Sequence, residues 1–157
     1  NQWQDSFANN AFSLNIFRLS GIYGPGRNSF ASIKEGNAKR IIKKNLFINR
    51  IHVEDIVGCL FASTKTKNYS GLYNLSDDEP APPQDVVIYA CKLLGLRPPP
   101  KTIYNEKNTY DKEYKFYFDS KKVSNEKVKE RFKYKLKYKS YREGLESILQ
   151  KKTNLNY

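Results

Sequence analysis

Short apolar runs alternate with segments of helical spacing along much of the chain. Residues 15–19 and 71–75 are mainly apolar runs, which predict two buried strands of a core sheet. Between them, residues 54–64 have the spacing of a helix whose apolar positions share one face, namely Ile56, Val57, Leu60 and Phe61. Strands that alternate with helices indicate an α/β fold.

Glycine and proline mark the ends of two further helices. Residues 30–35 predict a short helix that Gly36 ends, and a longer helix is predicted over residues 82–94, before Gly95. Proline suits the start of this longer helix, because the first helical turn makes no use of the missing N–H. Glycine favours the left-handed conformation that ends many helices.

Helical spacing and a capping pattern predict two helices in the C-terminal third of the chain. Residues 120–132 have helical spacing, and Ser140 with Glu143 forms the capping-box pattern at the start of a last helix. That helix is expected to end near residue 150, with residues 151–157 as a frayed tail.

Several segments carry no helical pattern. Residues 20–29 contain three glycines and a proline, which predict a sharply turning loop without regular structure. Residues 41–48 predict a small hairpin. Residues 97–100 predict an extended connector, and the tyrosine-rich residues 101–118 an irregular strap.

Two features indicate part of a longer protein. The chain contains no methionine, and residues 2–12 predict the last turns of an amphipathic helix without its beginning. Two core strands are fewer than a parallel sheet usually has, so we expect the remaining strands upstream of residue 1. A sheet that lacks its neighbours exposes an apolar face, so the isolated chain is expected to be poorly soluble.

The composition fits a folded domain with a strong positive charge. Of the 157 residues, 39% are hydrophobic and 14% aromatic, which is enough for a packed core. No apolar run is long enough to cross a membrane. The net charge of +12 is compatible with a nucleic-acid-binding surface. Because the lysines are spread over the whole chain among many asparagines, we favour a compositional bias over a basic binding patch.

The residues that could bind a metal are few and dispersed. Cys59 and Cys91 both lie in apolar helical patterns, and His52 is the only histidine. This set makes no metal site. We expect two buried, reduced thiols, which suits a cytoplasmic protein.

Five segments together resemble the C-terminal half of the extended short-chain dehydrogenase/reductase superfamily, in its NAD-dependent epimerase/dehydratase branch. The first reads Arg-Leu-Ser-Gly-Ile-Tyr-Gly-Pro-Gly-Arg-Asn and the second Arg-Ile-His-Val-Glu-Asp-Ile. In order, the five segments are residues 18–28, 50–56, 73–80, 119–125 and 141–145. Each is weak alone, but their order and spacing hold over nearly the full chain.

The resemblance implies the C-terminal part of a Rossmann-like doubly wound parallel sheet plus a small α/β substrate lobe. Residues 1–78 would belong to the NAD(P)-binding domain, whose N-terminal half is absent, and residues 79–150 to the lobe. The family's glycine-rich phosphate loop and its catalytic Tyr-x-x-x-Lys would lie upstream. Tyr117 and Lys121 have that spacing but stand in the wrong place. We therefore expect no catalytic residue in this chain and no activity from it alone.

The resemblance also implies a cofactor contact in the first segment. In the family, the loop after residues 15–19 closes over the nicotinamide end of NAD or NADP. Backbone groups of Leu19, Ser20 and Ile22 would make these contacts, because the glycines let the backbone approach closely. A tight crossover between two elements is the alternative interpretation of this loop.

Four residues are expected to face the substrate. Arg27 and Asn28 follow the loop, and an arginine is suited to a carboxylate or phosphate. Nucleotide-sugar members of the family carry Asn where this chain has Gly21 and often Arg where it has Ile48, so a nucleotide-sugar substrate is less favoured. Arg50 could replace the second donor only if no bulge separates it from residue 48. A surface arginine is the alternative for Arg27.

Three other polar positions admit a catalytic or a structural interpretation. His52 could act as an acid or base, but a histidine at a helix entry that bonds nearby backbone is favoured. Asp55 is likewise expected to be structural. The acidic residues 77–79 could bind a cation, but carboxylates that accept hydrogen bonds from backbone donors near a helix are favoured.

The main hypothesis is the C-terminal part of an NAD(P)-dependent oxidoreductase or epimerase acting on an unidentified small molecule. The intact parent is expected in the cytoplasm, away from membranes, and could form a homodimer. A non-catalytic NAD(P)-binding sensor or scaffold is the second hypothesis, and a basic nucleic-acid-binding module is less favoured. The upstream sequence separates the first two, because only the enzyme needs Tyr-x-x-x-Lys. Steeply salt-dependent binding to DNA or RNA would support the third.

Overall fold

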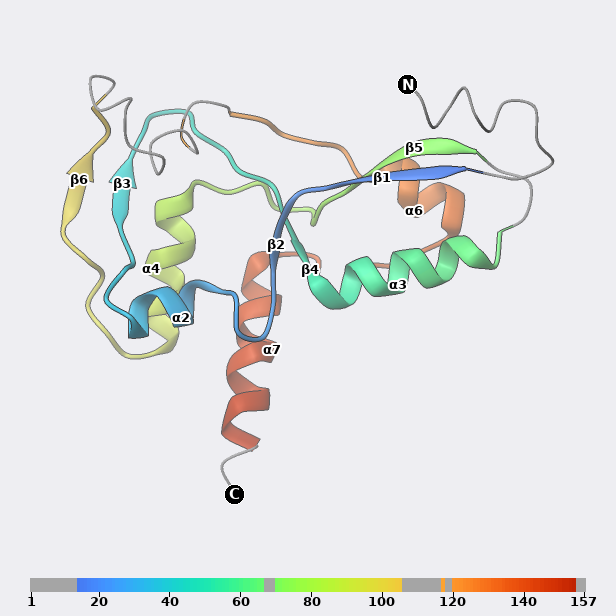
Figure 1. Cartoon of the computed structure of the whole chain (residues 1–157). Coiled ribbons are helices and arrows are strands. Elements are labelled where there is room, and N and C mark those ends of the chain that lie inside the picture. The colour runs from blue at the N-terminus through green and yellow to red at the C-terminus, as the bar shows by residue number, and fades with distance from the viewer. Residues whose placement is uncertain (1–13, 67–69, 106–116, 118–119, 155–157) are drawn as a thin grey trace.

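Parallel strand pairs joined by helices form the framework of the chain (Figure 1). The computed structural model describes residues 14–66, 70–105, 117 and 120–154. Within these residues the pairs are β1 (Asn15–Leu19) with β5 (Gly71–Leu75), β2 (Gly21–Tyr23) with β4 (Arg50–His52), and β3 (Arg40–Ile42) with β6 (Lys101–Ile103). All three pairs are parallel, which confirms the predicted α/β class.

The pair β1–β5 is built on the two strands that the apolar runs predict. Asn15 lies opposite Gly71 and Leu19 opposite Leu75, without a bulge. Parallel neighbours need a crossover, and the helix α3 (Val53–Thr64) lies on that path. A core of Ile51, Ile56, Cys59, Tyr73, Leu75, Val128, Phe132 and Leu136 joins β4, α3 and β5 to α6 (Glu126–Phe132) and the segment after it.

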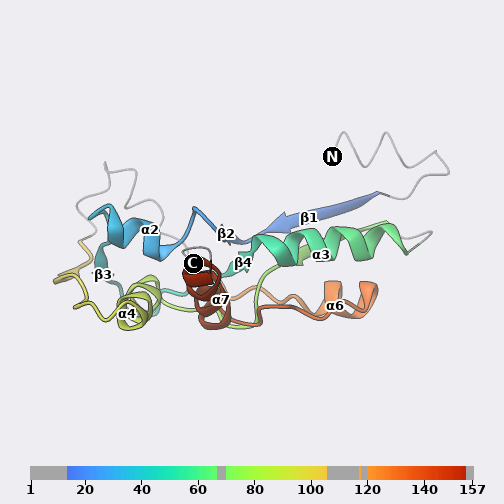
Figure 2. The same ribbon diagram turned by 90° about the horizontal axis from the view of Figure 1, so that it is seen from below.

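A second core lies among the remaining helices. α2 (Ser29–Lys34) and α4 (Pro83–Leu93) pack together, and α4 also contacts α7 (Tyr141–Asn154). Its buried members are Ala81, Val86, Ala90, Tyr141 and Leu145. Figure 2 looks along α7 and shows α2 and α4 on one side of it and α3 and α6 on the other. The short pair β2–β4 therefore lies between two separately packed ends.

The domain division at residue 78 stays a prediction, and packing contacts cross it in both directions. α6 lies beyond residue 78 yet packs on α3 and β5, whereas α2 and β3 precede it and pack on α4. The sheet part and the lobe are therefore interleaved along the chain in the part that the structure describes.

The predicted hairpin at residues 41–48 is wrong. β3 pairs in parallel with β6, inside the segment expected to be an irregular strap, and Ile48 forms an antiparallel bridge with Ala81. A strand partner that is distant in sequence leaves no local signal. Residues 46–48 are apolar and close in sequence to residues 41–42, so the pattern predicts a local partner instead. Most of the strap lies outside the described residues.

Two other boundaries differ from the predictions. Residues 20–29 contain the strand β2, whereas the sequence predicts no regular structure there. The helix predicted from residue 120 begins only at Glu126. Before α6, residues 120–123 lie along residues 45–49. Ser120 Oγ donates to the Asn45 carbonyl at 2.8 Å, and the Val123 N–H donates to Asn49 Oδ1 at 2.9 Å. These long-range bonds outweigh the local helical preference of the segment.

The capping signals place the last helix well, but not its end. The Glu143 N–H donates to Ser140 Oγ at 3.4 Å, and the Glu143 carboxylate accepts from the Lys139 N–H at 2.6 Å. α7 continues through Asn154, so the tail expected to fray from residue 151 is helical for its first four residues. The predicted helix at residues 2–12 lies outside the described residues. No helix in the described part is long and apolar enough to cross a membrane.

The buried face of α3 agrees with the predicted one only at Ile56. Val57 and Phe61 are each 62% exposed and Leu60 is 43% exposed, whereas Asp55, Ile56 and Cys59 are buried. The reason is a close approach beside Gly58, where a Cβ would lie 2.1 Å from the Tyr134 hydroxyl oxygen. The strand β1 is also less buried than predicted, since Leu19 is 46% exposed. Cys59 and Cys91 are both buried, as predicted, and neither is in a disulfide among the described residues.

Candidate functional site

The loop after β1 carries the chain from one strand pair to the next. The Ser20 N–H donates to the Leu75 carbonyl at 3.0 Å, which extends the β1–β5 ladder by one residue. The Gly21 N–H then donates to the Asn49 carbonyl at 3.1 Å and begins the β2–β4 pair. A Cβ on Gly21 would lie 3.2 Å from that oxygen. Packing between the strands therefore favours glycine at position 21.

A tight turn follows β2 and positions two of the predicted substrate residues. Gly24 and Arg27 exchange backbone hydrogen bonds of 3.0 and 3.2 Å around Pro25 and Gly26, and Gly26 has φ +78°. Proline followed by a glycine of positive φ fits a type II turn. Asn28 then caps α2: its Oδ1 accepts the first free N–H groups of the helix, and its Nδ2 donates to the Gly24 carbonyl at 2.8 Å. Its side chain is therefore occupied by the turn and the helix.

Three of the four predicted substrate residues line one pocket. This pocket, called pocket 1, has a volume of about 220 Å³ and is lined by Arg27, Asn28 and Arg50, by the apolar residues Ile22 and Val86, and by Tyr141. Arg27 is exposed at the rim and Arg50 is half-buried. The structure thus brings together side chains from β2, α2, β4, α4 and α7. Tyr141 was missed as a site residue, although it begins one of the five resembling segments.

A second, larger pocket holds two of the three predicted cofactor residues. Pocket 2 has a volume of about 510 Å³ and is lined by Leu19 and Ser20 together with Arg18, Ile48, Asn74 and Lys121. Ile22 lines pocket 1 instead. Leu19 and Asn74 lie at the carboxyl ends of β1 and β5, and ligands of open α/β sheets bind beyond that edge.

Arg50 does not take the place of a donor at position 48. Ile48 lines pocket 2, whereas Arg50 lines pocket 1. Arg50 Nη1 donates to the Ile48 and Ala81 carbonyls at 2.9 and 3.1 Å, which fixes the guanidinium beside pocket 1. Burial lowers its pKa, although the nearby Asp77 carboxylate opposes the shift. No carboxylate lies within ion-pair distance of Arg50 in the described residues.

Asp77 is a buried acid behind Arg50. It is 2% exposed, and burial raises its pKa to about 7, with only partial compensation from the Glu79 N–H and from Arg50. Oδ1 accepts from the Glu79 N–H at 3.3 Å, as the favoured structural interpretation predicts, but Oδ2 has no partner among the described residues. Asp78 instead pairs with Lys129, and Glu79 with Arg142. The described residues hold no group of acids, histidines or cysteines that could bind a metal.

His52 is a helix-entry residue, as favoured. Its Nδ1 accepts the Glu54 N–H at 3.1 Å, and the side chain is 1% exposed. The ring lies against Tyr23 and Tyr138, with centroids 5.1 and 4.2 Å away. Burial lowers the pKa of His52 and so favours the neutral ring, whose Nδ1 caps α3. It lines neither pocket 1 nor pocket 2.

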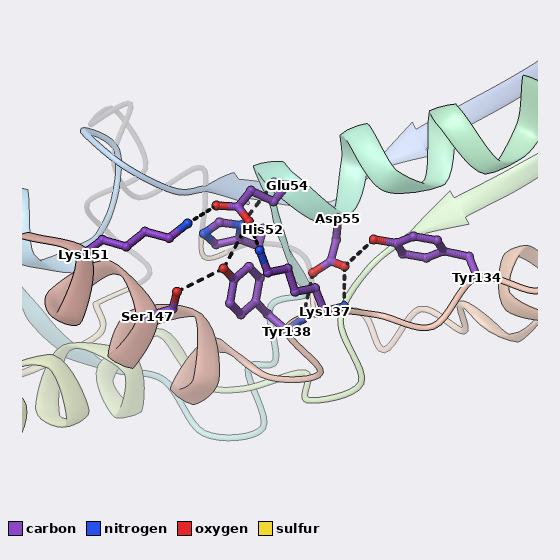
Figure 3. Close-up of polar contacts among 8 residues, drawn as sticks. All are labelled: His52, Glu54, Asp55, Tyr134, Lys137, Tyr138, Ser147 and Lys151. Carbon is purple, nitrogen blue, oxygen red and sulfur yellow. Dashed lines mark hydrogen bonds and ion pairs between the residues drawn. The ribbon is translucent and has the colours of Figure 1, made fainter.

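The first turn of α3 forms hydrogen bonds and ion pairs with the C-terminal segment of the chain (Figure 3). Asp55 is fully buried and accepts hydrogen bonds from the Tyr134 hydroxyl at 2.9 Å and from the N–H groups of Lys137 and Tyr138 at 2.7 and 3.1 Å. Glu54 accepts from both Lys137 and Lys151, and these bonds lower its pKa to about 2. These contacts support the structural interpretation of Asp55.

Comparisons with known proteins found relatives that match just over half of the chain. No family model matches it. It is 32% identical over 92 residues to Protein YeeZ of Escherichia coli K12, and 29% identical over 96 residues to a 3-diazoavenalumate denitrifying reductase of a Streptomyces species. These matches cover 55% and 56% of this chain but only 31% and 30% of the relatives.

Solved structures extend the likeness to nearly the whole chain. A functionally unknown conserved protein from Silicibacter pomeroyi is 43% identical with a TM-score of 0.86, covering 96% of this chain and 52% of that one. The human epimerase family protein SDR39U1, solved with NADPH, is 15% identical with a TM-score of 0.74, covering 90% of this chain and 50% of that one. The chain has a Rossmann-like α/β fold in common with these structures. Further structural neighbours include a UDP-N-acetylglucosamine 4-epimerase from Bacillus cereus and a dTDP-glucose 4,6-dehydratase from Bacillus anthracis solved with NAD. The chain spans about half the length of these solved structures.

Proposed function

We propose that this chain is the C-terminal part of an NAD(P)-dependent oxidoreductase or epimerase of the extended short-chain dehydrogenase/reductase type. The observation that carries the proposal is the position of pocket 2 at the carboxyl ends of the parallel strands β1 and β5. That edge is where nucleotide cofactors bind in open α/β sheets. The fold that the chain shares with NAD- and NADPH-containing structures supports the same assignment.

The roles of the residues follow from the two pockets. Leu19 and Ser20 would contact the nicotinamide end of the dinucleotide in pocket 2, whose volume of about 510 Å³ is within the usual range for small-molecule sites. Arg27 and Arg50 would face the substrate in pocket 1. The proton-transferring tyrosine and its lysine would come from residues outside this chain. The intact protein would act on a small molecule, and it could do so as a homodimer.

The test requires the protein encoded by the complete reading frame, since the chain spans about half of its solved neighbours. Titration with NADH and NADPH, followed by cofactor fluorescence, is expected to show binding of at least one of them. Leu19→Asp is expected to weaken it at least about tenfold, because a carboxylate would face the cofactor. Leu96→Asp changes an equally exposed leucine outside the pockets and serves as the control.

Two results would count against the proposal. One is a failure of both cofactors to bind to the folded protein. The other is equal binding by the wild type and Leu19→Asp. Cofactor binding without a Tyr-x-x-x-Lys pair in the complete sequence would instead favour the sensor or scaffold alternative, because hydride and proton transfer need that pair beside the nicotinamide.

A further inference from the structure

Pocket 1 contains two donors without protein acceptors. Arg50 uses Nη1 for two carbonyl groups, and its remaining N–H groups have no partner among the described residues. The Tyr141 hydroxyl is buried and equally without a partner in the part that the structure describes. Buried polar groups in folded proteins are nearly always hydrogen-bonded. The buried Tyr141 hydroxyl and the remaining N–H groups of the half-buried Arg50 line the same pocket, so they favour a ligand that accepts hydrogen bonds.

The charge around the pocket defines the kind of acceptor. Arg27 and Arg50 are the charged residues that line it, and no acid does. Arg50 is half-buried without an ion pair, so its charge is incompletely compensated. A half-buried guanidinium gains most from an anion that accepts two N–H bonds in one plane. A planar carboxylate meets this requirement.

The surroundings favour a single negative charge over a double one. The buried Asp77 and, more weakly, the exposed Asp85 act electrostatically on Arg50, although neither lines the pocket. A second charge on the ligand would be repelled by these carboxylates. Asn28 already accepts the Phe30 and Ala31 N–H groups at the start of α2, so these two groups are not available to a ligand. The repulsion of a second charge disfavours a phosphate monoester.

The rest of the pocket is small and combines apolar with hydroxyl-bearing side chains. Ile22, Val86 and Leu145 contribute the apolar part of the lining, and Ser29 and Ser32 contribute hydroxyl groups. The volume of about 220 Å³ lies below the range of roughly 300–1,000 Å³ that drug-sized ligands occupy. A compact ligand with one anionic end and an apolar part fits the volume, the arginines and the apolar side chains of the lining.

We propose that pocket 1 binds a small apolar monocarboxylate, whose carboxylate lies between Arg50 and the Tyr141 hydroxyl. This assignment rests on the proposed function, because it gives that function its substrate class. It adds Tyr141 as a residue that determines specificity. It also separates this protein from enzymes whose substrates carry a nucleoside diphosphate.

Benzoate is the probe for this site, with benzamide as the neutral analogue and phenyl phosphate as the dianionic one. Calorimetric titration of the protein from the complete reading frame is expected to show benzoate binding, with benzamide and phenyl phosphate each at least about tenfold weaker. Arg50→Gln and Tyr141→Phe are each expected to weaken benzoate binding about tenfold, as expected for the loss of a hydrogen bond to a charged group. Arg50→Lys keeps the charge but not the fork of donors, so it is expected to recover only part of the benzoate affinity that Arg50→Gln loses.

Matched controls separate the pocket from the surface and the fold. Arg97→Gln removes an exposed arginine outside the pocket, and Tyr89→Phe removes the hydroxyl of the ring next to Tyr141; neither is expected to change benzoate binding. Tyr141→Phe removes a hydroxyl without a partner, so the variant is expected to melt cooperatively like the wild type.

The outcomes distinguish this inference from the proposed function. Absence of benzoate binding, tighter binding of phenyl phosphate, or benzoate binding unchanged in both the Arg50 and Tyr141 variants would overturn the monocarboxylate site. NADH and NADPH are titrated into the same samples. If a cofactor binds and benzoate does not, the inference fails and the function stands. If benzoate binds through Arg50 and Tyr141 but neither cofactor binds, the monocarboxylate site stands and the proposed function fails.

Discussion

The hydroxyl group of Tyr23 occupies the space that a side chain on Gly144 would need. A Cβ on Gly144 would lie 2.1 Å from that hydroxyl oxygen, which instead donates to the Ser140 carbonyl at 3.3 Å. This contact locks the end of β2 against the first turn of α7. Since Tyr23 and Tyr141 both line pocket 1, the contact also sets the distance between two of its walls.

Gly144→Ala is therefore expected to destabilise the protein. Overpacking costs about 1–3 kcal/mol, against a gain of at most about 1 kcal/mol from the better helix propensity of alanine. Chemical denaturation measures the difference, with Gln150→Ala on the exposed side of the same helix as control. Adding Tyr23→Phe is expected to recover part of the loss, because it removes the nearest atom. Strictly additive effects would contradict the close contact.

Asp55→Ala is expected to cost about 3 kcal/mol or more, because three donors lose their acceptor and two of them are backbone N–H groups. Asp85 has the corresponding third position in α4 but is exposed, so Asp85→Ala is the matched control. Tyr134→Phe removes only one of the three bonds and is expected to fall between them. Equal stability of the two aspartate variants would show that the contacts in Figure 3 do not hold the C-terminal segment.

The ion pairs of Glu54 predict a loss of stability in acid. The hydrogen bonds from Lys137 and Lys151 hold the folded-state pKa near 2, below the usual value of 4.5. The contribution is therefore complete above pH 4.5 and is lost as the pH falls towards about 2. Solvent screens these exposed lysines, so the effect is smaller than the shift alone suggests.

Denaturation midpoints across this pH range test the Glu54 pairs. Glu54→Gln is expected to be less stable than the wild type at pH 6 and equally stable near pH 2. The difference at pH 6 is expected to shrink in 1 M salt. A difference that persists unchanged at pH 2 would assign the effect to packing rather than to charge.

Asp77 has the opposite pH dependence. Its pKa is raised by burial from 3.8 to about 7, so the folded state binds the extra proton between these values. Stability is expected to fall as the pH rises from about 4 to 7 and to level off above. Asp77→Asn keeps an acceptor for the Glu79 N–H without the buried charge, and is expected to be more stable than the wild type at pH 8 by on the order of 1 kcal/mol. Asp78→Asn, which loses the pairing with Lys129, is the control and is expected to give no such gain.

Local signals in the sequence predicted the elements that they act on directly. The apolar runs at residues 15–19 and 71–75 became β1 and β5, and Gly36 and Gly95 follow the ends of α2 and α4 with φ of +72° and +67°. The arginines of pocket 1 were also found from the sequence, because they stand in or beside resembling segments.

The partners of short strands could not be predicted from the sequence. β2, β3, β4 and β6 have three residues each, so none carries enough alternation to identify a partner. The pairing of β3 with β6 depends on the packing of α4 between them along the chain. Ile48 and Arg50 line different pockets for the same reason, namely that their strand partners are distant in sequence. Ile48 bridges to Ala81, whereas Arg50 belongs to β4 and pairs with Gly21.

The sequence by itself determined the helices, the two core strands and the α/β class, since these depend on residues close together in the chain. Tertiary structure decided which face of α3 is buried, because Asp55 finds its donors about 80 residues away and Gly58 admits Tyr134. It also decided that Tyr141 meets Arg50 at one pocket. Burial and long-range hydrogen bonds select such contacts, and neither can be read from the spacing of residues along a chain.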